Sequence, residues 1–249
     1  MSILSTKQLS KHFDGVYAVD SLSLSFEKGK VTSLIGPNGS GKSTLINTLT
    51  GVLLMDGGLV YMGKNTELSE IKPYQVSEYG VTRTFQDVRL FEQMAVLDNI
   101  LVVLTDRGMG SFIEKHGTKH LEITEQVLKK VNLWEKRGEL AVNLSYGQRK
   151  LLEIARILAM IYSPSGTAQI FFLDEPFAGL FPEMIKVVTS VIKELREKGK
   201  TVILVEHNME LIRALSDYIF VLDSGKLLAE GKPAQVLARK DVIEAYLGE

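Results

Sequence analysis

The sequence predicts an α/β fold with a mostly parallel core sheet, an N-terminal antiparallel β part and an inserted helical part. Short apolar runs that end in polar or turn residues alternate with amphipathic stretches, as buried parallel strands alternate with the helices that cover them. Near the N-terminal end, apolar residues alternate with serines, which is typical of a strand with one solvated face. Between residues 86 and 168 the β pattern fades and helical periodicity replaces it.

Composition excludes several classes of protein. With 29 basic and 30 acidic residues the formal net charge is −1, so the chain lacks the basic footprint of a nucleic-acid-binding protein. The absence of cysteine excludes disulfides and thiolate metal sites. The longest nearly apolar run, residues 157–162, is far shorter than the roughly 20 residues of a membrane helix. Because residues 1–9 also show no signal segment, we expect a cytoplasmic protein that binds no nucleic acid.

The predicted core consists of strands and helices in alternation. Apolar runs rich in β-branched or aromatic residues predict core strands over residues 31–36, 170–176 and 201–207. Amphipathic stretches predict helices over residues 42–53, 182–198 and 209–216. The serine-rich antiparallel strand is predicted within residues 15–30.

The helical part is predicted as an insert in this core. Residues 121–131 and 151–159 carry the clearest helical spacing, and residues 105–120 are the most polar and least regular piece. We therefore expect one domain over 1–249, with an α/β core from 1–86 and 166–249 and a helical subdomain from 87–165.

A phosphate-binding loop follows the first core strand. Gly36, Gly41, Lys42 and Ser43 match G-x-x-x-x-G-K-[ST] between a strand and a helix. Glycines allow backbone N–H groups to surround a phosphate at a helix N-terminus, where the helix dipole favours negative charge. Lys42 would reach the β- and γ-phosphates, and the Ser43 hydroxyl would bind Mg²⁺. The predicted nucleotide contacts are Gly36, Pro37, Asn38, Gly39, Ser40, Gly41, Lys42, Ser43 and Thr44.

Polar side chains end the other two core strands. Asp174 follows an apolar run and is a candidate Mg²⁺ ligand, while the adjacent Glu175 is a candidate base for attack on the γ-phosphate. His207 ends the next apolar run, at the edge where ligands bind in open α/β sheets. Gln86, by position alone, is an exposed loop glutamine.

A second anion site is predicted at the N-terminus of a later helix. Ser145 and Gln148 have the spacing of a capping box. A capping box does not require Gly147, which costs helix stability within the first turn. A glycine there allows the backbone to approach an anion closely.

In this order, the motifs resemble the nucleotide-binding subunit of an ATP-binding-cassette (ABC) transporter over essentially the whole chain. The resemblance implies that Phe13, or otherwise Tyr17, stacks on adenine, and that Gln86 senses Mg²⁺ and water. It implies a Mg²⁺-associated Asp174, a catalytic Glu175 and a switch histidine at His207. Ser145, Gly147 and Gln148 lie in the signature motif, which such proteins present to the ATP of a facing subunit.

The resemblance also implies partners. These are ATP or ADP, a second ATPase subunit (an identical or paralogous chain) in a head-to-tail sandwich dimer, and membrane permeases at the cytoplasmic face of the membrane. Residues 87–91, which begin at Asp87 and include Arg89, Leu90 and Phe91, are a candidate permease-docking segment, and packing inside the helical part is an equal alternative.

The residues in and around the motifs are similar to those of the ATPases of branched-chain amino-acid importers. The alternatives are a urea-type importer, a lipopolysaccharide exporter, or an ABC ATPase without a transport role. A small-molecule kinase and a nucleotide-regulated module without turnover are more distant, because neither accounts for both the signature motif and Glu175.

Two residues depart from the family pattern. Tyr146 stands in the signature motif where glycine is usual, and it leaves Ser145 and Gly147 unchanged. Phe181 stands in the loop after Glu175 where aspartate is usual, which puts signalling between subunits through that loop in doubt.

Replacing Ser145 with Arg tests the facing-subunit assignment. The bulky cation should leave ATP binding by the monomer intact and abolish hydrolysis and dimer closure. Nucleotide titration, phosphate release and size-exclusion chromatography measure these three properties. Loss of ATP binding by the monomer would contradict the assignment.

Overall fold

The computed structural model describes residues 1–63, 66–105, 117–163 and 167–247. The chain forms two compact units. The first unit contains Met1–Arg83, Gln169–Glu175 and Glu194–Glu249, and the second contains Thr84–Ala168 and Pro176–Lys193. Of the irregular polar stretch at 105–120, residues 106–116 lie outside the described residues.

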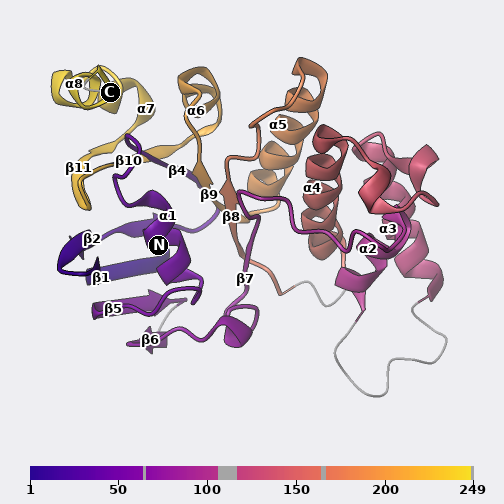
Figure 1. Cartoon of the computed structure of the whole chain (residues 1–249), viewed down its shortest axis with the longest axis horizontal. Helices are drawn as coiled ribbons and strands as arrows, with labels where there is room; N and C mark the ends of the chain where they lie inside the picture. Colours follow the sequence, from indigo (N-terminus) through magenta and orange to yellow (C-terminus); the bar gives the residue numbers. More distant parts are fainter. Residues whose placement is uncertain (64–65, 106–116, 164–166, 248–249) are drawn as a thin grey trace. The chain divides into compact units, whose positions relative to one another are not determined.

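A six-stranded sheet is the centre of the first unit (Figure 1), and its mostly parallel pairing confirms the predicted type of core sheet. The β10, β4, β9, β8 and β7 strands pair in parallel, and only β11 is antiparallel. Every residue of β4, β8 and β9 is buried, as expected for strands covered on both faces. In spatial order the strands are β11 (Lys226–Gly231), β10 (Tyr218–Asp223), β4 (Val31–Ile35), β9 (Thr201–Val205), β8 (Ile170–Asp174) and β7 (Val81–Arg83).

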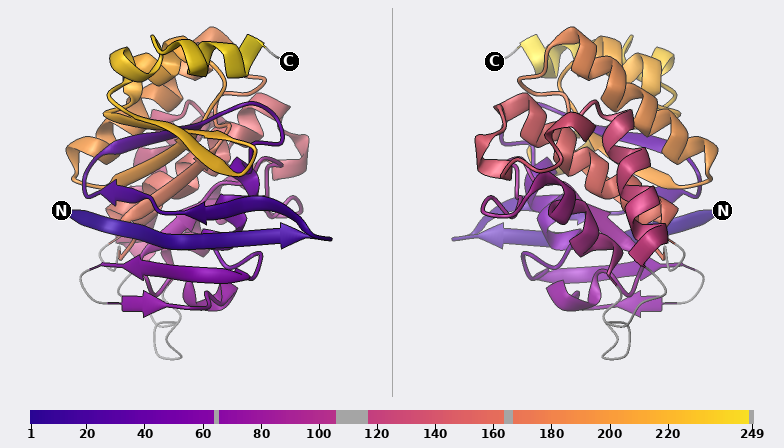
Figure 2. Two further views of the ribbon diagram at one scale, coloured as in Figure 1. Left: turned by 90° about the vertical axis from the view of Figure 1, so that its left-hand side faces the viewer. Right: turned by 90° about the vertical axis from the view of Figure 1, so that its right-hand side faces the viewer.

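Successive residues of these strands face two different cores. Leu34 packs with α1 and the antiparallel sheet, whereas Ile35 packs with α6, α7 and α8. This follows from the two-residue period of a strand. Figures 1 and 2 show the same helices on opposite sides of the sheet. Their bounds are α1 (Lys42–Leu49), α6 (Met209–Leu215), α7 (Pro233–Val236) and α8 (Lys240–Leu247).

The antiparallel sheet has the order β2-β1-β5-β6, with β3 also paired to β1. The alternation of buried Leu22, Leu24 and Phe26 with exposed serines is confirmed. The prediction of one strand over 15–30 is wrong, because the Thr6 hydroxyl bonds to Leu22 O and Leu24 N (2.9 Å each) and interrupts the backbone ladder there. The strands are β1 (Ser2–Phe13), β2 (Val16–Leu22), β3 (Ser25–Glu27), β5 (Gly57–Met62) and β6 (Thr66–Leu68).

The first helix is shorter than the predicted 42–53 and ends at Leu49. Gly51 has φ +70°, and a Cβ there would lie 2.7 Å from Ile71 O. This left-handed turn ends the helix. The other two core helices begin at the predicted residues and end one residue earlier, at Glu197 and Leu215.

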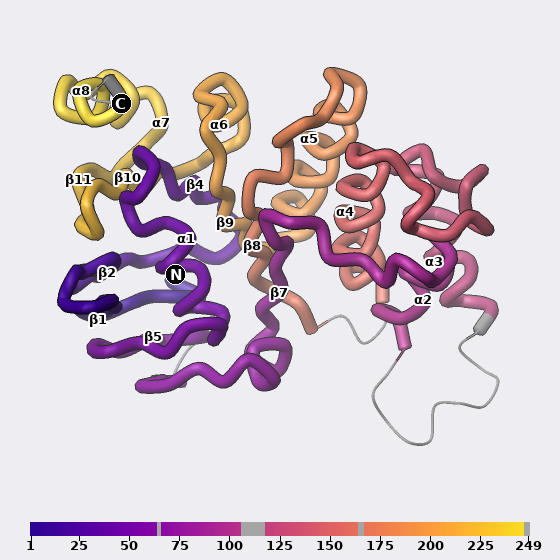
Figure 3. Tube along the Cα trace, viewed as in Figure 1, coloured from indigo at the N-terminus to yellow at the C-terminus, as the bar shows by residue number. Residues whose placement is uncertain are grey.

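The described residues of the second unit form helices and no strand. Figure 3 traces the path of the chain through these helices. The α2, α3 and α4 helices pack on one another. No helix in the described part of the chain is long and apolar enough to cross a bilayer. The helices of this unit are α2 (Val96–Leu104), α3 (Gly117–Lys130), α4 (Tyr146–Tyr162) and most of α5 (Pro182–Glu197). The described residues also form the 3-10 turns η1 (Pro73–Gln75) in the first unit and η2 (Trp134–Lys136) and η3 (Ala141–Asn143) in the second.

Candidate active site

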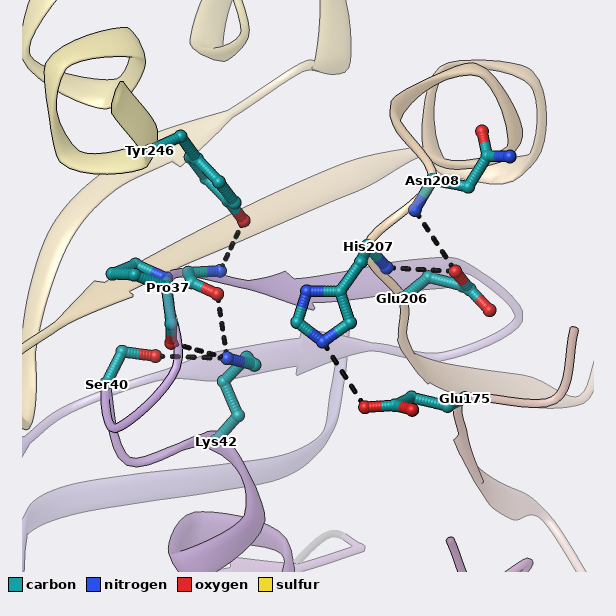
Figure 4. Close-up of polar contacts among 9 residues, drawn as sticks. Pro37, Ser40, Lys42, Glu175, Glu206, His207, Asn208 and Tyr246 are labelled. Atoms are coloured by element: carbon teal, nitrogen blue, oxygen red, sulfur yellow. Dashed lines mark hydrogen bonds and ion pairs between the residues drawn. The ribbon is translucent and has the colours of Figure 1, made fainter. Parts of the chain in front are cut away.

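Three predicted site segments of the first unit lie at one edge of the parallel sheet (Figure 4). The register pairs Val205 with Leu34 on one side and with Asp174 on the other. Gly36, Glu175 and His207 therefore follow the aligned strand ends by two, one and two residues. This edge, at the carboxyl ends of the strands, is where ligands bind in open α/β sheets.

At two positions of the phosphate loop, glycine is required by close contact with neighbouring backbone, in addition to the access that it gives an anion to backbone N–H groups. Gly36 has φ +148° and Gly41 has φ +99°. A Cβ at Gly36 would collide with the carbonyl oxygen of Leu222, and one at Gly41 would collide with that of Ala18. Both glycines therefore allow backbone to pass directly over backbone.

Lys42 lies folded over its own loop. Its Nζ atom donates to the carbonyl oxygens of Gly36 (2.7 Å) and Pro37 (2.8 Å) and to the Ser40 hydroxyl (3.3 Å). The side chain is only 7% exposed, so its charge is held among these oxygens. Asn38, Gly39 and Ser43 are exposed at the surface of the loop, and Thr44 is half-buried.

Asp174 is buried at the end of β8 and is oriented by a cation. The Arg83 Nη2 atom lies 3.5 Å from Asp174 Oδ2. Arg83 Nη1 also donates to Asn47 Oδ1 and Thr50 Oγ1, each at 2.8 Å. Through Arg83, the carboxylate is thus tied to the helix that follows the phosphate loop. Sequence reasoning missed Arg83, which is 91 positions (174 − 83) from its partner.

Glu175 has a left-handed backbone, with φ +47°. This conformation is uncommon outside glycine, asparagine and aspartate, and such residues concentrate at functional sites. The hydrogen bond from Glu175 N to Val205 O (3.0 Å) helps to hold it. The Glu175 carboxylate lies 3.2 Å from His207 Nε2, so the two predicted catalytic side chains meet (Figure 4).

The backbone around His207 is fixed by its neighbours. The carboxylate of Glu206 accepts from His207 N (2.9 Å) and Asn208 N (3.1 Å). The Asn208 side chain caps α6 by accepting from Glu210 N and Leu211 N. Asparagine immediately before a helical pattern is an N-cap signal, so Asn208 could have been found from the sequence.

In the second unit, the predicted capping box is confirmed. Ser145 Oγ accepts from Gln148 N (3.3 Å), and Ser145 N donates to Gln148 Oε1 (3.0 Å). Gly147 is buried, and a Cβ there would lie 2.6 Å from Met184 Sδ. Packing against α5 is therefore a second reason for this glycine.

Tyr146 has a packing role within the same unit. A Cβ on Gly179, which has φ +70°, would lie 2.9 Å from Tyr146 Cε1. The tyrosine ring thus covers the backbone of the loop that precedes α5, while 45% of the residue stays exposed. The unusual residue of the signature motif contacts the segment that contains the other departure, Phe181.

Gln86 is exposed, and residues on both sides of it are fastened to α4. Phe85 N donates to Glu153 Oε1 (3.4 Å), and Arg156 Nη1 donates to Arg89 O (2.6 Å). The Arg89 guanidinium lies 3.9 Å from the centre of the Phe85 ring. Glu153 is 8% exposed, and this burial raises the pKa of its carboxyl group to about 7.

Comparison with known proteins decides what this arrangement is. The ABC transporter family model matches residues 19–178, which include the phosphate loop, the capped helix and the Asp174–Glu175 pair. The chain belongs to the ABC transporter family. A second model, described as the branched-chain amino acid ATP-binding cassette transporter, matches residues 226–249.

Several curated relatives of this ABC ATPase are named as transport proteins. The high-affinity branched-chain amino acid transport ATP-binding protein BraF of Pseudomonas aeruginosa is 38% identical, over 99% of this chain and 98% of its own length. The corresponding LivG protein of Escherichia coli K12 gives the same figures. The probable LivG protein of Archaeoglobus fulgidus is 34% identical over 100% and 96%.

Solved structures agree on the fold of this ABC ATPase. A crystal structure of an ATP-binding cassette in its ADP conformation is 33% identical, covers all of both chains and has a TM-score of 0.82. A nucleotide-free ATP-binding cassette is 34% identical over all of both chains, with a TM-score of 0.81. The chain is thus an ATPase with the phosphate-loop fold of the ABC cassettes.

Two aromatic residues of this ABC ATPase remain candidates for contact with adenine. Phe13 ends β1 and is 46% exposed, and Tyr17 in β2 is 53% exposed. Lys11 Nζ lies 5.3 Å from the centre of the Phe13 ring. Tyr17 makes an edge contact with His12, with ring centres 5.6 Å apart. Both rings are accessible at the surface of the first unit.

Replacing Glu153 with Gln should stabilise the ATPase at pH 8 by up to about 3 kcal/mol. The folded chain keeps this proton up to a pH of about 7, whereas the unfolded group titrates near 4.5. Between these pH values the folded chain binds more protons than the unfolded chain, so this group lowers stability as pH rises. Urea unfolding at pH 4.5 and pH 8 measures the effect.

The matched control is Glu183→Gln, which removes an exposed carboxylate (83% exposed side chain) from the same unit. Its effect on the free energy of unfolding should be small at both pH values. If Glu153→Gln changes stability equally at pH 4.5 and pH 8, the buried carboxyl does not titrate in this range.

Proposed function

We propose that this chain binds ATP with Mg²⁺ at the sheet edge of its first unit, hydrolyses it, and thereby drives import of branched-chain amino acids through separate permease subunits. The observation that carries the hydrolytic part is the meeting of Glu175 and His207 (3.2 Å) at the strand end next to the phosphate loop. The 38% identity to named branched-chain amino acid transport ATP-binding proteins supports the transported solute.

Phosphoryl transfer depends mainly on positioning and on stabilisation of charge. Lys42 would exchange its loop carbonyl partners for the β- and γ-phosphate oxygens of ATP. The Glu175 carboxylate would orient the attacking water and accept its proton. His207 Nε2, which lies 3.2 Å from the Glu175 carboxylate, would exchange this partner for the γ-phosphate and donate to it in the tautomer that carries hydrogen on Nε2.

The residues of this chain fit a Mg²⁺ ion bound together with phosphates. In the first unit, Ser43 and Asp174 provide a hydroxyl and a carboxylate oxygen, donor types that Mg²⁺ prefers. Gln86, the further predicted ligand, has an amide oxygen of the same hard type. Within the described residues, no group of three or more acidic or histidine side chains could hold a metal alone. An ion that keeps waters and substrate oxygens needs only one or two protein ligands. Bound there, Mg²⁺ would neutralise phosphate charge.

The signature residues would serve the ATP of a second, head-to-tail ATPase subunit, which is an identical chain or a paralogue. Ser145 is exposed at the N-terminus of a 17-residue helix, α4, whose dipole favours an anion. Gly147 and Gln148 would complete this site. ATP would thus join two subunits, and its hydrolysis would release them, which is the two-state element that transport requires.

Residues 87–91 would dock a permease helix at the cytoplasmic face of the membrane. Phe91 is 45% exposed, and its backbone is held by Asn99, which accepts from Phe91 N (3.0 Å) and donates to Phe91 O (3.1 Å). The Arg156 guanidinium lies 5.4 Å from the centre of the Phe91 ring. An apolar ring presented on a fixed backbone favours docking over the alternative of core packing.

We propose a single domain, with residues 87–165 as the helical subdomain that carries the signature motif. The match of residues 226–249 to the branched-chain amino acid cassette model favours that solute class over urea or lipopolysaccharide. Purification with its permeases and uptake assays with leucine and urea would test this choice. Uptake of urea alone would contradict it.

Replacing Glu175 with Gln should lower the rate of ATP hydrolysis by about 100-fold or more. The amide keeps the shape of the side chain and cannot accept the proton of water. ATP binding should persist, and the ATP-bound dimer should accumulate. Phosphate release and size-exclusion chromatography with ATP measure these outcomes.

The Glu183→Gln variant is the control, since it removes one exposed carboxylate (83% exposed side chain), eight positions after Glu175, that has no predicted role in the chemistry. Hydrolysis by this variant should match the wild type. An unchanged rate in Glu175→Gln would exclude Glu175 as the base.

A further inference from the structure

The α8 helix makes a direct contact with the phosphate loop. The hydroxyl oxygen of Tyr246 accepts a hydrogen bond from Gly36 N at 2.6 Å (Figure 4). The helix is fixed by Val242, which is 2% exposed and packs in the same core as Ile35 and Ile219. Tyr246 itself is half-buried against this core. The tyrosine therefore reaches the loop from a fixed base.

Both backbone polar groups of Gly36 have hydrogen-bond partners. Its N–H group donates to Tyr246, and its carbonyl oxygen accepts from Lys42 Nζ at 2.7 Å. Its φ of +148° and its close approach to Leu222 exclude every other residue type. Glycine has more backbone freedom than any other residue, so the orientation of the two peptide groups on either side of the Gly36 Cα atom depends on these hydrogen-bond partners.

A pocket of about 190 Å³ lies on one side of the Tyr246 ring and is lined by Met209, Leu237 and Ile243, among others. The ring also packs against the core that contains Val242. The hydrogen bond to Gly36 joins this packed ring to the phosphate loop.

We propose that Tyr246 is a positioning residue that holds the first residue of the phosphate loop in its nucleotide-binding shape and so raises the affinity for ATP and ADP. It acts through Gly36 and Lys42 and touches no reacting atom. The inference rests on the proposed role of residues 36–44 as the phosphate site. The proposal also gives residues 226–249, which contain Tyr246, a role in nucleotide binding.

Replacing Tyr246 with Phe removes only the hydroxyl group and tests this proposal. Loss of one such hydrogen bond should raise the Kd for ATP and for ADP about fivefold. The KM for ATP should rise by a similar factor while kcat stays within about twofold, because the affected interaction is uniform binding. Fluorescence titration with a labelled ADP and steady-state phosphate release measure these constants.

Amide hydrogen exchange in the absence of nucleotide provides an independent reading. The Gly36 amide should exchange about tenfold faster in Tyr246→Phe, while amides of buried strand residues such as Leu34 and Val205 keep their rates. This comparison separates a local change from general destabilisation. Equal acceleration of all three amides would mean that the hydroxyl only stabilises the fold, and would overturn the proposal.

Tyr218→Phe is the matched control, since it removes the hydroxyl group of another half-buried tyrosine in the same unit. Its ring packs edge-on against Phe220 (5.3 Å between ring centres), and its Kd values should stay at the wild-type level. A Kd for Tyr246→Phe equal to that of the control would overturn the proposal. If the wild type binds no nucleotide, the proposed function fails, and the Gly36 exchange rate still reports whether Tyr246 holds the loop.

Discussion

The parallel hydrogen bonding of β4 with β9, and of β9 with β8, is the interaction on which the rest of the nucleotide site depends. Val205 pairs with Leu34 on one side and Asp174 on the other. This register alone aligns the strand ends that carry Gly36, Glu175 and His207. A slip by one residue would turn the side chains of the slipped strand to the opposite face of the sheet and misalign these strand ends. The geometry of the site is thus set by backbone pairing before any side-chain contact forms.

The sheet also holds conformations that the isolated chain would avoid. Glu175 adopts a left-handed backbone, which costs of order 1 kcal/mol or more, and its N–H remains bonded to Val205 O (3.0 Å). Gly36 passes over the carbonyl group of Leu222 at a separation that no side chain permits. The fully buried strands that precede these two residues stabilise the fold enough to offset this local strain.

Much of this site could be predicted because its signals are local. The phosphate loop, the polar residues after apolar strands and the capping box each lie within about ten consecutive residues. Arg83, the contact of Gly147 with Met184, and Tyr246 had no such signal, because each depends on a partner far away in the sequence. The prediction from local sequence was wrong at two boundaries. It extended the first helix past Leu49, where the contact of Gly51 with Ile71 decides the end. It also joined β2 to β3, which the hydrogen bonds of Thr6 separate.

The pairing of β4 has a consequence for synthesis of the chain on the ribosome. Leu34 pairs with Val205 of β9, which is synthesised 171 residues later (205 − 34). Its neighbour on the other side, β10, is synthesised later still. At about 5–20 residues per second, both edges of this apolar strand stay unpaired for roughly 9 to 34 s. An unpaired apolar edge invites association with other nascent chains. The nascent chain is therefore exposed to association through β4 until β9 and β10 emerge from the ribosome.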